Sequence, residues 1–199
     1  MTEDPSALLK NLSDEMLIFM LVVTIIFQWF IFGFNWVGTF LEKTGLKGVG
    51  LGKFRGVHFA WAIAFLLASN LLLSGLAWLL AQVGLPLSGD LGLLVPDFFE
   101  GKIIWVLVSL TAGFCEEIAF RGYLMTRLRL VLGNRSWVIP TIVSSLVFGI
   151  CHAYQGIPGL ILISTYGLLF SLLYLRTGSL WPCVIAHFFQ DFSHLFFPQ

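Results

Sequence analysis

Residues 103–117 read IIWVLVSLTAGFCEE, an uncharged run that ends in two adjacent glutamates. Arg121 follows four residues after Glu117. A helix that crosses the hydrocarbon core of a bilayer needs about 20 mainly apolar residues, and a charged residue inside it costs at least ~2.5 kcal/mol. The stretch is therefore typical of a membrane-spanning helix, and its three ionisable groups, Glu116, Glu117 and Arg121, are candidates for a functional role.

The composition of the whole chain agrees with a membrane setting. Of its 199 residues, 58% are hydrophobic and 11% are charged, and the formal net charge is zero. Soluble domains carry about 25% charged residues, so the sequence predicts a multi-pass integral membrane protein with membrane lipids around it. No basic patch is dense enough to predict a nucleic-acid partner.

Apolar stretches along the chain predict about six spanning helices. None alternates with a period of two, so the predicted fold class is an all-α, polytopic transmembrane helical bundle and not a β-barrel. The expected helices begin and end near residues 16–36, 58–85, 102–132, 137–154, 157–175 and 180–197. The predicted segments are 1–57 (a polar lead-in, the first helix and a basic, glycine-rich loop), 58–98 (the second helix and an acidic loop) and 99–199 (a four-helix core).

The connections between these helices alternate in charge. The first and third are basic, the second is acidic, and the charged residues that define them are Lys43, Lys47, Lys53, Arg55, Asp90, Asp97, Glu100, Arg127, Arg129 and Arg135. Basic loops stay on the cytoplasmic side of a membrane. We therefore expect the basic loops in the cytoplasm and both termini outside, in a bacterial-type plasma membrane.

The helical spacing of Glu116 and Glu117 indicates that the two glutamates have different roles. Neighbouring residues of a helix point about 100° apart, so Glu116 and Glu117 cannot share one face. Glu117 and Arg121 are four residues apart and can form an ion pair on one face. Glu116 is then free to face another group, as a general base or a metal ligand.

Other ionisable side chains lie in the apolar stretches that follow. His152 ends one of them, and His187 and Asp191 lie four residues apart on the last expected helix, so they share a face. Together with Glu116 they could converge in the bundle and activate water, with or without a metal ion. The zinc motif HExxH and the serine motif GxSxG are both absent.

Three motifs in order resemble a known family. Residues 116–121 (EEIAFR) resemble the EExxxR signature of the CPBP family of intramembrane proteases, 148–152 (FGICH) resemble its FxxxH motif, and 187–191 (HFFQD) resemble its HxxxN/D motif. The family includes the type II CAAX prenyl endopeptidases and the bacterial Abi and bacteriocin-immunity proteins. The resemblance covers about residues 99–197, so the four-helix core is expected to be the catalytic one.

The resemblance also implies a role for each matched residue. Glu116 and His152 would activate water, Glu117 and Arg121 would hold the helix and its active face in place, and Phe148 would support the site. His187 and Asp191 would stabilise the oxyanion or help to hold a metal. The catalytic set implied is Glu116, His152, His187 and Asp191, and the same four are the candidate ligands for a divalent metal such as zinc.

Position 191 departs from the motif of the CAAX endopeptidases, which ends in Asn. Asn donates a hydrogen bond, whereas Asp191 donates one only when it is protonated. Asp suits a metal ligand or a group that orients His187 better than an oxyanion donor. The family has been described both as metalloproteases and as metal-free, glutamate-dependent proteases, and the sequence leaves both open.

Depth in the membrane gives one further expectation. At ~1.5 Å per residue, Glu116 and His152 would miss each other if the glutamate helix ended soon after Arg121. They can meet if that helix runs unbroken past Gly122, and Leu124, Leu128 and Leu132 on one face favour this. We therefore expect one long helix over residues 101–132.

The residues leave three functions open. The first is an intramembrane endopeptidase that cleaves a peptide or protein substrate at the membrane by Glu- and His-activated water. The second is a proton- or ion-coupled transporter whose carboxylates and histidines form a relay. The third is a non-catalytic interaction or immunity protein with a structural polar core.

Overall fold

The computed structural model describes residues 13–87 and 94–197 and shows an all-α bundle, with no strand in that part of the chain. This confirms the predicted fold class. The predicted lead-in residues 1–12 and Asp90 of the acidic connection lie outside the described residues. The helices are α2 (Asp14–Leu41), α3 (Val57–Gln82), α4 (Phe99–Glu117), α5 (Met125–Val131), α6 (Val138–Ile150), α7 (Gly156–Thr177) and α8 (Trp181–Ser193).

Local signals in the sequence account for several helix ends. The Ser13 side chain accepts a hydrogen bond from the Met16 amide at 3.3 Å and caps α2, whose first turn is acidic. Gly178 follows α7 in the left-handed conformation that glycine adopts readily. Pro182 lies in the first turn of α8, where its missing amide proton leaves no hydrogen bond unmade.

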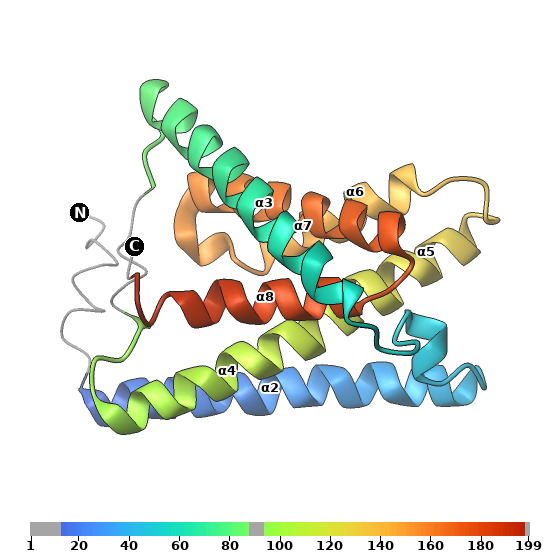
Figure 1. Ribbon diagram of the computed structural model, residues 1–199, viewed down its shortest axis with the longest axis horizontal. Helices are drawn as coiled ribbons and strands as arrows, with labels where there is room; N and C mark the ends of the chain where they lie inside the picture. Colours follow the sequence, from blue (N-terminus) through green and yellow to red (C-terminus); the bar gives the residue numbers. More distant parts are fainter. Residues whose placement is uncertain (1–12, 88–93, 198–199) are drawn as a thin grey trace.

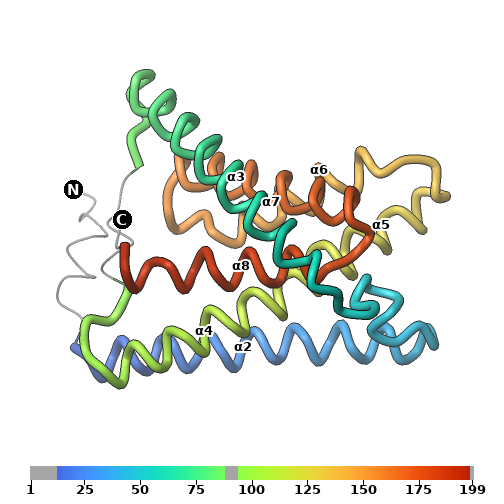
Figure 2. The backbone as a smooth tube through the Cα atoms, viewed as in Figure 1, coloured from blue at the N-terminus to red at the C-terminus, as the bar shows by residue number. Residues whose placement is uncertain are grey.

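The helices run back and forth along one axis of the molecule (Figures 1 and 2). α2 lies along α4, and α8 packs against α4 on one side and against α3 and α7 on the other. α6 packs on α7, and α3 crosses the bundle obliquely. The first residue of α2 and the last of α8 lie at the same end, as an even number of alternating segments requires (Figure 1).

Four helical stretches are long and apolar enough to cross a membrane: Asp14–Leu41, Val57–Gln82, Phe99–Val131 and Ala153–Thr177. The chain is therefore an integral membrane protein. α6 and α8 have only 13 residues each, or about 20 Å at 1.5 Å per residue, against a hydrocarbon core about 30 Å thick. Both end earlier than the sequence predicted, at Ile150 instead of 154 and at Ser193 instead of 197.

The expected long helix is present, since α4 continues without a break through a π-helical segment, Ile118–Leu124, into α5. The π segment was not expected. Gly122 lies within it, and a Cβ at that position would come 2.8 Å from the Val49 carbonyl oxygen and 2.9 Å from Leu180. Glycine there lets the helix touch the loop that follows α2.

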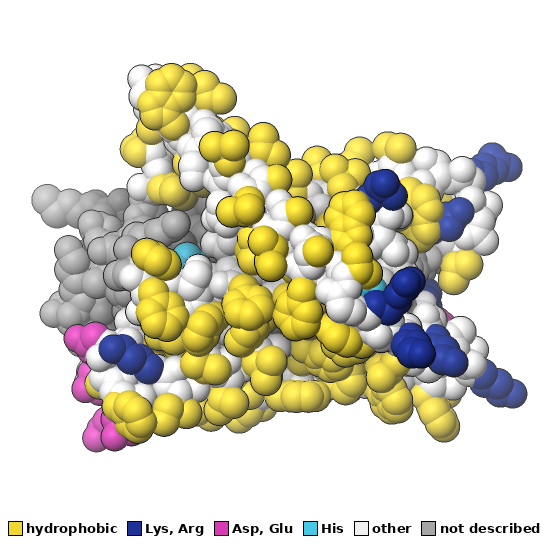
Figure 3. Space-filling model, in the orientation of Figure 1, with side chains coloured by type: hydrophobic (Ala, Val, Ile, Leu, Met, Phe, Trp, Pro, Cys, Tyr) yellow, Lys and Arg dark blue, Asp and Glu magenta, His cyan; other side chains and the backbone are white. Residues whose placement is uncertain are grey.

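The surface is banded. Hydrophobic side chains cover the flanks of the bundle, while most of the visible Lys and Arg side chains gather at one end and most of the visible Asp and Glu side chains at the other (Figure 3). The apolar flank includes Phe30 and Phe34 on α2 and Leu71 on α3, each more than two thirds exposed. Such a surface suits lipid tails with headgroups at both ends.

Candidate functional site

The ion pair expected from the helical spacing is present at the start of the π segment. Arg121 Nη1 donates to Glu117 Oε1 at 2.8 Å, and both side chains are completely buried. Arg121 Nη2 donates to the Gly167 carbonyl at 3.2 Å, which ties α7 to this helix. The guanidinium also lies 4.4 Å from the centroid of the Phe148 ring, so its charge has both an anion and an aromatic face as partners.

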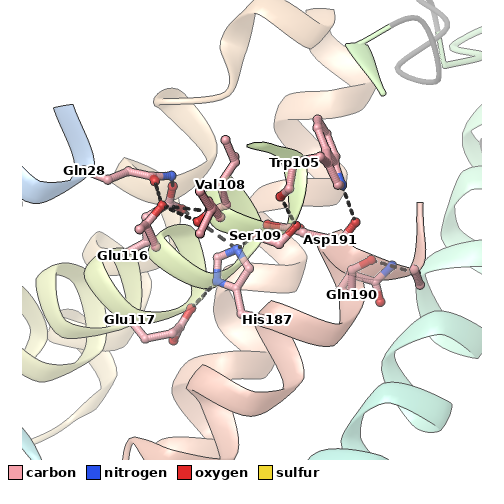
Figure 4. Close-up of polar contacts among 12 residues, drawn as sticks. Gln28, Trp105, Val108, Ser109, Glu116, Glu117, His187, Gln190 and Asp191 are labelled. Atoms are coloured by element: carbon pink, nitrogen blue, oxygen red, sulfur yellow. Dashed lines mark hydrogen bonds and ion pairs between the residues drawn. The ribbon is translucent and has the colours of Figure 1, made fainter. Parts of the chain in front are cut away.

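Glu117 also reaches across to α8. His187 Nδ1 lies 2.9 Å from Glu117 Oε1, the oxygen that accepts from Arg121. Since an ionised carboxylate only accepts, the proton of this hydrogen bond belongs to Nδ1. Glu117 therefore orients the imidazole (Figure 4), and the same carboxylate pairs with Arg121.

The other ring nitrogen of His187 faces two further carboxylates. Nε2 lies 4.0 Å from Glu116 Oε2 and 3.6 Å from Asp191 Oδ2. The Asp191 backbone is held in turn, because Trp105 Nε1 of α4 donates to its carbonyl oxygen at 3.0 Å. One imidazole edge is thus placed between a carboxylate from α4 and a carboxylate from its own helix (Figure 4).

Glu116 has a partner that the sequence reasoning missed. Gln28 Nε2 of α2 donates to Glu116 Oε1 at 3.3 Å, and Gln28 Oε1 accepts from Thr111 Oγ1 at 2.5 Å. A glutamine inside a mainly apolar spanning helix was the signal that could have found it. Glu116 keeps 19% of its side chain exposed, whereas Glu117 is fully buried.

Among the described residues, His152 makes no hydrogen bond or ion pair with the carboxylates. It follows α6 in a turn, and its Nδ1 is 2.9 Å from the Phe148 carbonyl oxygen. The ring of Phe148 contacts both histidines, with centroids 5.0 Å from His152 and 6.1 Å from His187. The structure thus brings together Glu116, Glu117, His187 and Asp191, and the Phe148 ring lies near both His187 and His152.

The fit of these side chains to a divalent metal is poor. Within residues 13–87 and 94–197, no group of three or more His, Cys, Asp or Glu side chains has the geometry to hold a metal ion. We therefore derive no step through a metal.

The arrangement can carry acid–base chemistry. Glu116 offers a partly exposed carboxylate, and the oriented His187 offers a nitrogen 4.0 Å from it. A water molecule that binds beside both could lose a proton to the carboxylate, and a substrate oxygen could receive a hydrogen bond from the imidazole.

Comparison with known proteins adds one finding. The family model described as "Type II CAAX prenyl endopeptidase Rce1-like" matches residues 98–193. All the motif residues, from Glu116 to Asp191, lie inside this match, and Gln28 lies outside it. No curated protein and no solved structure matched the chain.

Proposed function

We propose that this chain, which belongs through residues 98–193 to the family of type II CAAX prenyl endopeptidases, is an intramembrane endopeptidase. In this proposal Glu116 activates the attacking water. The observation that supports this most is the pairing of a partly exposed Glu116 with an imidazole that Glu117 orients. The expected substrate is a peptide or protein that reaches the site from the membrane.

The proposed reaction begins with proton transfer from water to the Glu116 carboxylate. The water oxygen forms a bond to the peptide carbonyl carbon, and the carbonyl oxygen becomes an oxyanion. Collapse of this intermediate breaks the C–N bond, and the protonated Glu116 returns its proton to the leaving amine. Proton transfer by a positioned side chain contributes about 10²–10⁴ to a rate.

His187 is proposed to act as an imidazolium, which carries a proton on both ring nitrogens, and to donate a hydrogen bond from Nε2 to the oxyanion. Glu117 holds the opposite nitrogen, so the ring keeps its orientation as charge develops. Asp191, 3.6 Å from Nε2, is proposed to attract and orient the Nε2 proton and not to donate to the oxyanion itself. The Nδ1 atom of His152 faces the Phe148 carbonyl, so its Nε2 atom is proposed to form a hydrogen bond with the substrate or the water.

The test uses purified protein in liposomes with a farnesylated CAAX peptide and its unmodified counterpart. We expect the parent to cleave and Glu116→Gln to lose at least about a hundredfold in kcat. Glu100→Gln, an exposed acid in the first turn of the same helix, is the control and should cleave like the parent. If Glu116→Gln cleaves as fast as the parent, Glu116 is not the base.

Two further arms of that experiment separate the alternatives. Cleavage should survive dialysis against a chelator, and a loss that Zn²⁺ reverses would show that a metal activates the water. Proton flux into the liposomes that Glu116→Gln abolishes, without cleavage by the parent, would instead favour a proton-coupled transporter. A folded parent with neither activity would favour a non-catalytic interaction protein.

A further inference from the structure

Gln28 is a buried polar residue on a helix that the family match does not include. Its side chain is 4% exposed, and it belongs to a stripe of buried residues along α2 formed by Leu17, Leu21, Gln28, Asn35 and Thr39. These positions recur at intervals of four and seven, as one face of a helix does. This places Gln28 among the α2 residues that face the bundle, where α2 lies along α4 (Figure 1).

The two hydrogen bonds of Gln28 require an amide in one orientation. Its carbonyl oxygen accepts from Thr111 Oγ1, and its amino group donates to Glu116 Oε1 at 3.3 Å. An ionised carboxylate has no proton to donate, so only the amino end of the amide can face Glu116. Thr111 therefore helps to orient the amide, and the amide helps to orient the carboxylate.

The hydrogen bond from Gln28 gives the two carboxylate oxygens of Glu116 different surroundings. Because Gln28 holds Oε1, the other oxygen, Oε2, faces His187 Nε2 at 4.0 Å (Figure 4). A hydrogen bond to a charged acceptor is among the stronger ones in proteins, and here it is largely screened from water. We propose that Gln28 is a positioning residue that turns Oε2 of Glu116 toward His187, so that α2 completes the active site. This role rests on the proposed function of Glu116 as the base.

Asn35 shows that burial alone does not give Gln28 this role. It lies seven residues further along the same stripe of α2 and is 6% exposed. Its amide, however, donates to the Ile31 carbonyl of its own helix at 2.7 Å. Asn35 is therefore a matched control: a buried amide on the same face of α2 whose hydrogen bond leaves the site untouched.

The first experiment measures kcat and KM for Gln28→Met, Gln28→Glu and Asn35→Leu. Gln28→Met keeps the length of the side chain and removes both hydrogen bonds, so kcat should fall about tenfold to a hundredfold with KM little changed. The kcat of Gln28→Glu should be lower still, because a second carboxylate would then face Glu116. Asn35→Leu should keep the parental kcat. A parental kcat in Gln28→Met, or a change in KM alone, would overturn the proposal.

Thr111→Val supplies a second variant in case Gln28→Met does not fold. It removes the hydroxyl that holds the amide carbonyl and leaves Gln28 in place. We expect a smaller loss of kcat in the same direction, with KM again little changed. If the Gln28 variants do not fold and a folded Thr111→Val keeps the parental kcat, the proposal that Thr111 and Gln28 orient Glu116 is wrong.

A measurement independent of cleavage separates this proposal from the proposed function. The thermal unfolding midpoints of Gln28→Met, Glu116→Gln and the double variant should be non-additive, because the two side chains contact each other. The midpoints of Asn35→Leu, Glu116→Gln and their double variant should be additive. If the parent cleaves neither peptide, the proposed function fails, while coupling of Gln28 and Glu116 can still be seen. Additive midpoints for Gln28 and Glu116 would overturn the positioning role.

Discussion

Arg121 and Arg127 lie six residues apart and form ion pairs in opposite environments. The Arg121–Glu117 pair is fully buried, whereas Arg127 pairs with Glu42 at the surface. We expect Arg121→Met to cost about 3–5 kcal/mol of folding stability, because it removes the guanidinium and leaves the buried Glu117 charge with His187 as its one remaining partner. Arg127→Met should cost about 1 kcal/mol or less.

Unfolding of both variants in mixed detergent micelles measures the two losses of stability. The double variant Arg121→Met/Glu117→Gln should recover part of the stability, since it removes the unpaired charge. Equal losses of folding stability for Arg121→Met and Arg127→Met would show that the buried ion pair stabilises the fold no more than the surface pair does.

The same site shows which contacts a sequence can predict. Spacing within one helix predicted that Glu117 reaches Arg121 and that Glu116 does not, and both hold in the structure. The contacts from Glu117 to His187 and from Glu116 to Gln28 cross between helices. Those depend on how each helix is rotated about its axis, which spacing along one helix does not determine.

At the scale of the helices, Gly113 determines how closely α4 and α8 approach. A Cβ at this position would lie 2.9 Å from both the Phe188 amide nitrogen and the Val184 carbonyl oxygen. We expect Gly113→Ala to push α8 away from α4 and to carry His187, the neighbour of Phe188, away from both glutamates. The expected result is a loss of about 1–3 kcal/mol in stability and a lower kcat.

Gly33→Ala is the matched control for Gly113→Ala. Gly33 lies inside α2, and a Cβ there would meet no atom within 4 Å. Alanine at this position should leave kcat unchanged and leave stability unchanged or raised by up to about 1 kcal/mol. Thermal unfolding and peptide cleavage of both variants measure these changes in stability and kcat. If Gly113→Ala behaves like Gly33→Ala, the close approach of α4 and α8 does not position His187.

Helices were easier to predict than their ends and irregularities. The uncharged runs predicted the helices and the continuity of residues 99–131. They did not predict that α6 ends at Ile150, because Cys151, Ala153 and Tyr154 can extend an apolar helix and no glycine or proline follows before Gly156. Nothing in the sequence indicated the π segment either, since its Arg121 fits an ordinary i,i+4 pair and its Gly122 contacts the distant Val49.

At the scale of the whole molecule, charge is separated along the bundle axis, with most basic side chains at one end (Figure 3). The α2–α3 connection carries Lys43, Lys47, Lys53 and Arg55 at that end. The positive-inside rule leads us to propose that this end faces the cytoplasm of a bacterial-type plasma membrane. Trypsin, which cuts after Lys and Arg, should then cut this connection in inverted membrane vesicles and leave it intact in right-side-out spheroplasts.

Detergent-solubilised protein is the control for that experiment, because the α2–α3 connection should be cut there whatever the orientation in the membrane. Replacing Lys43, Lys47, Lys53 and Arg55 together by Gln should abolish the cut in inverted vesicles and so assign it to this connection. Cutting at the connection in intact spheroplasts would reverse the proposed orientation. The site would then open toward the opposite compartment, with the contacts of Glu116, His187 and Gln28 unchanged, because those contacts depend on helix packing and not on which side the loops face.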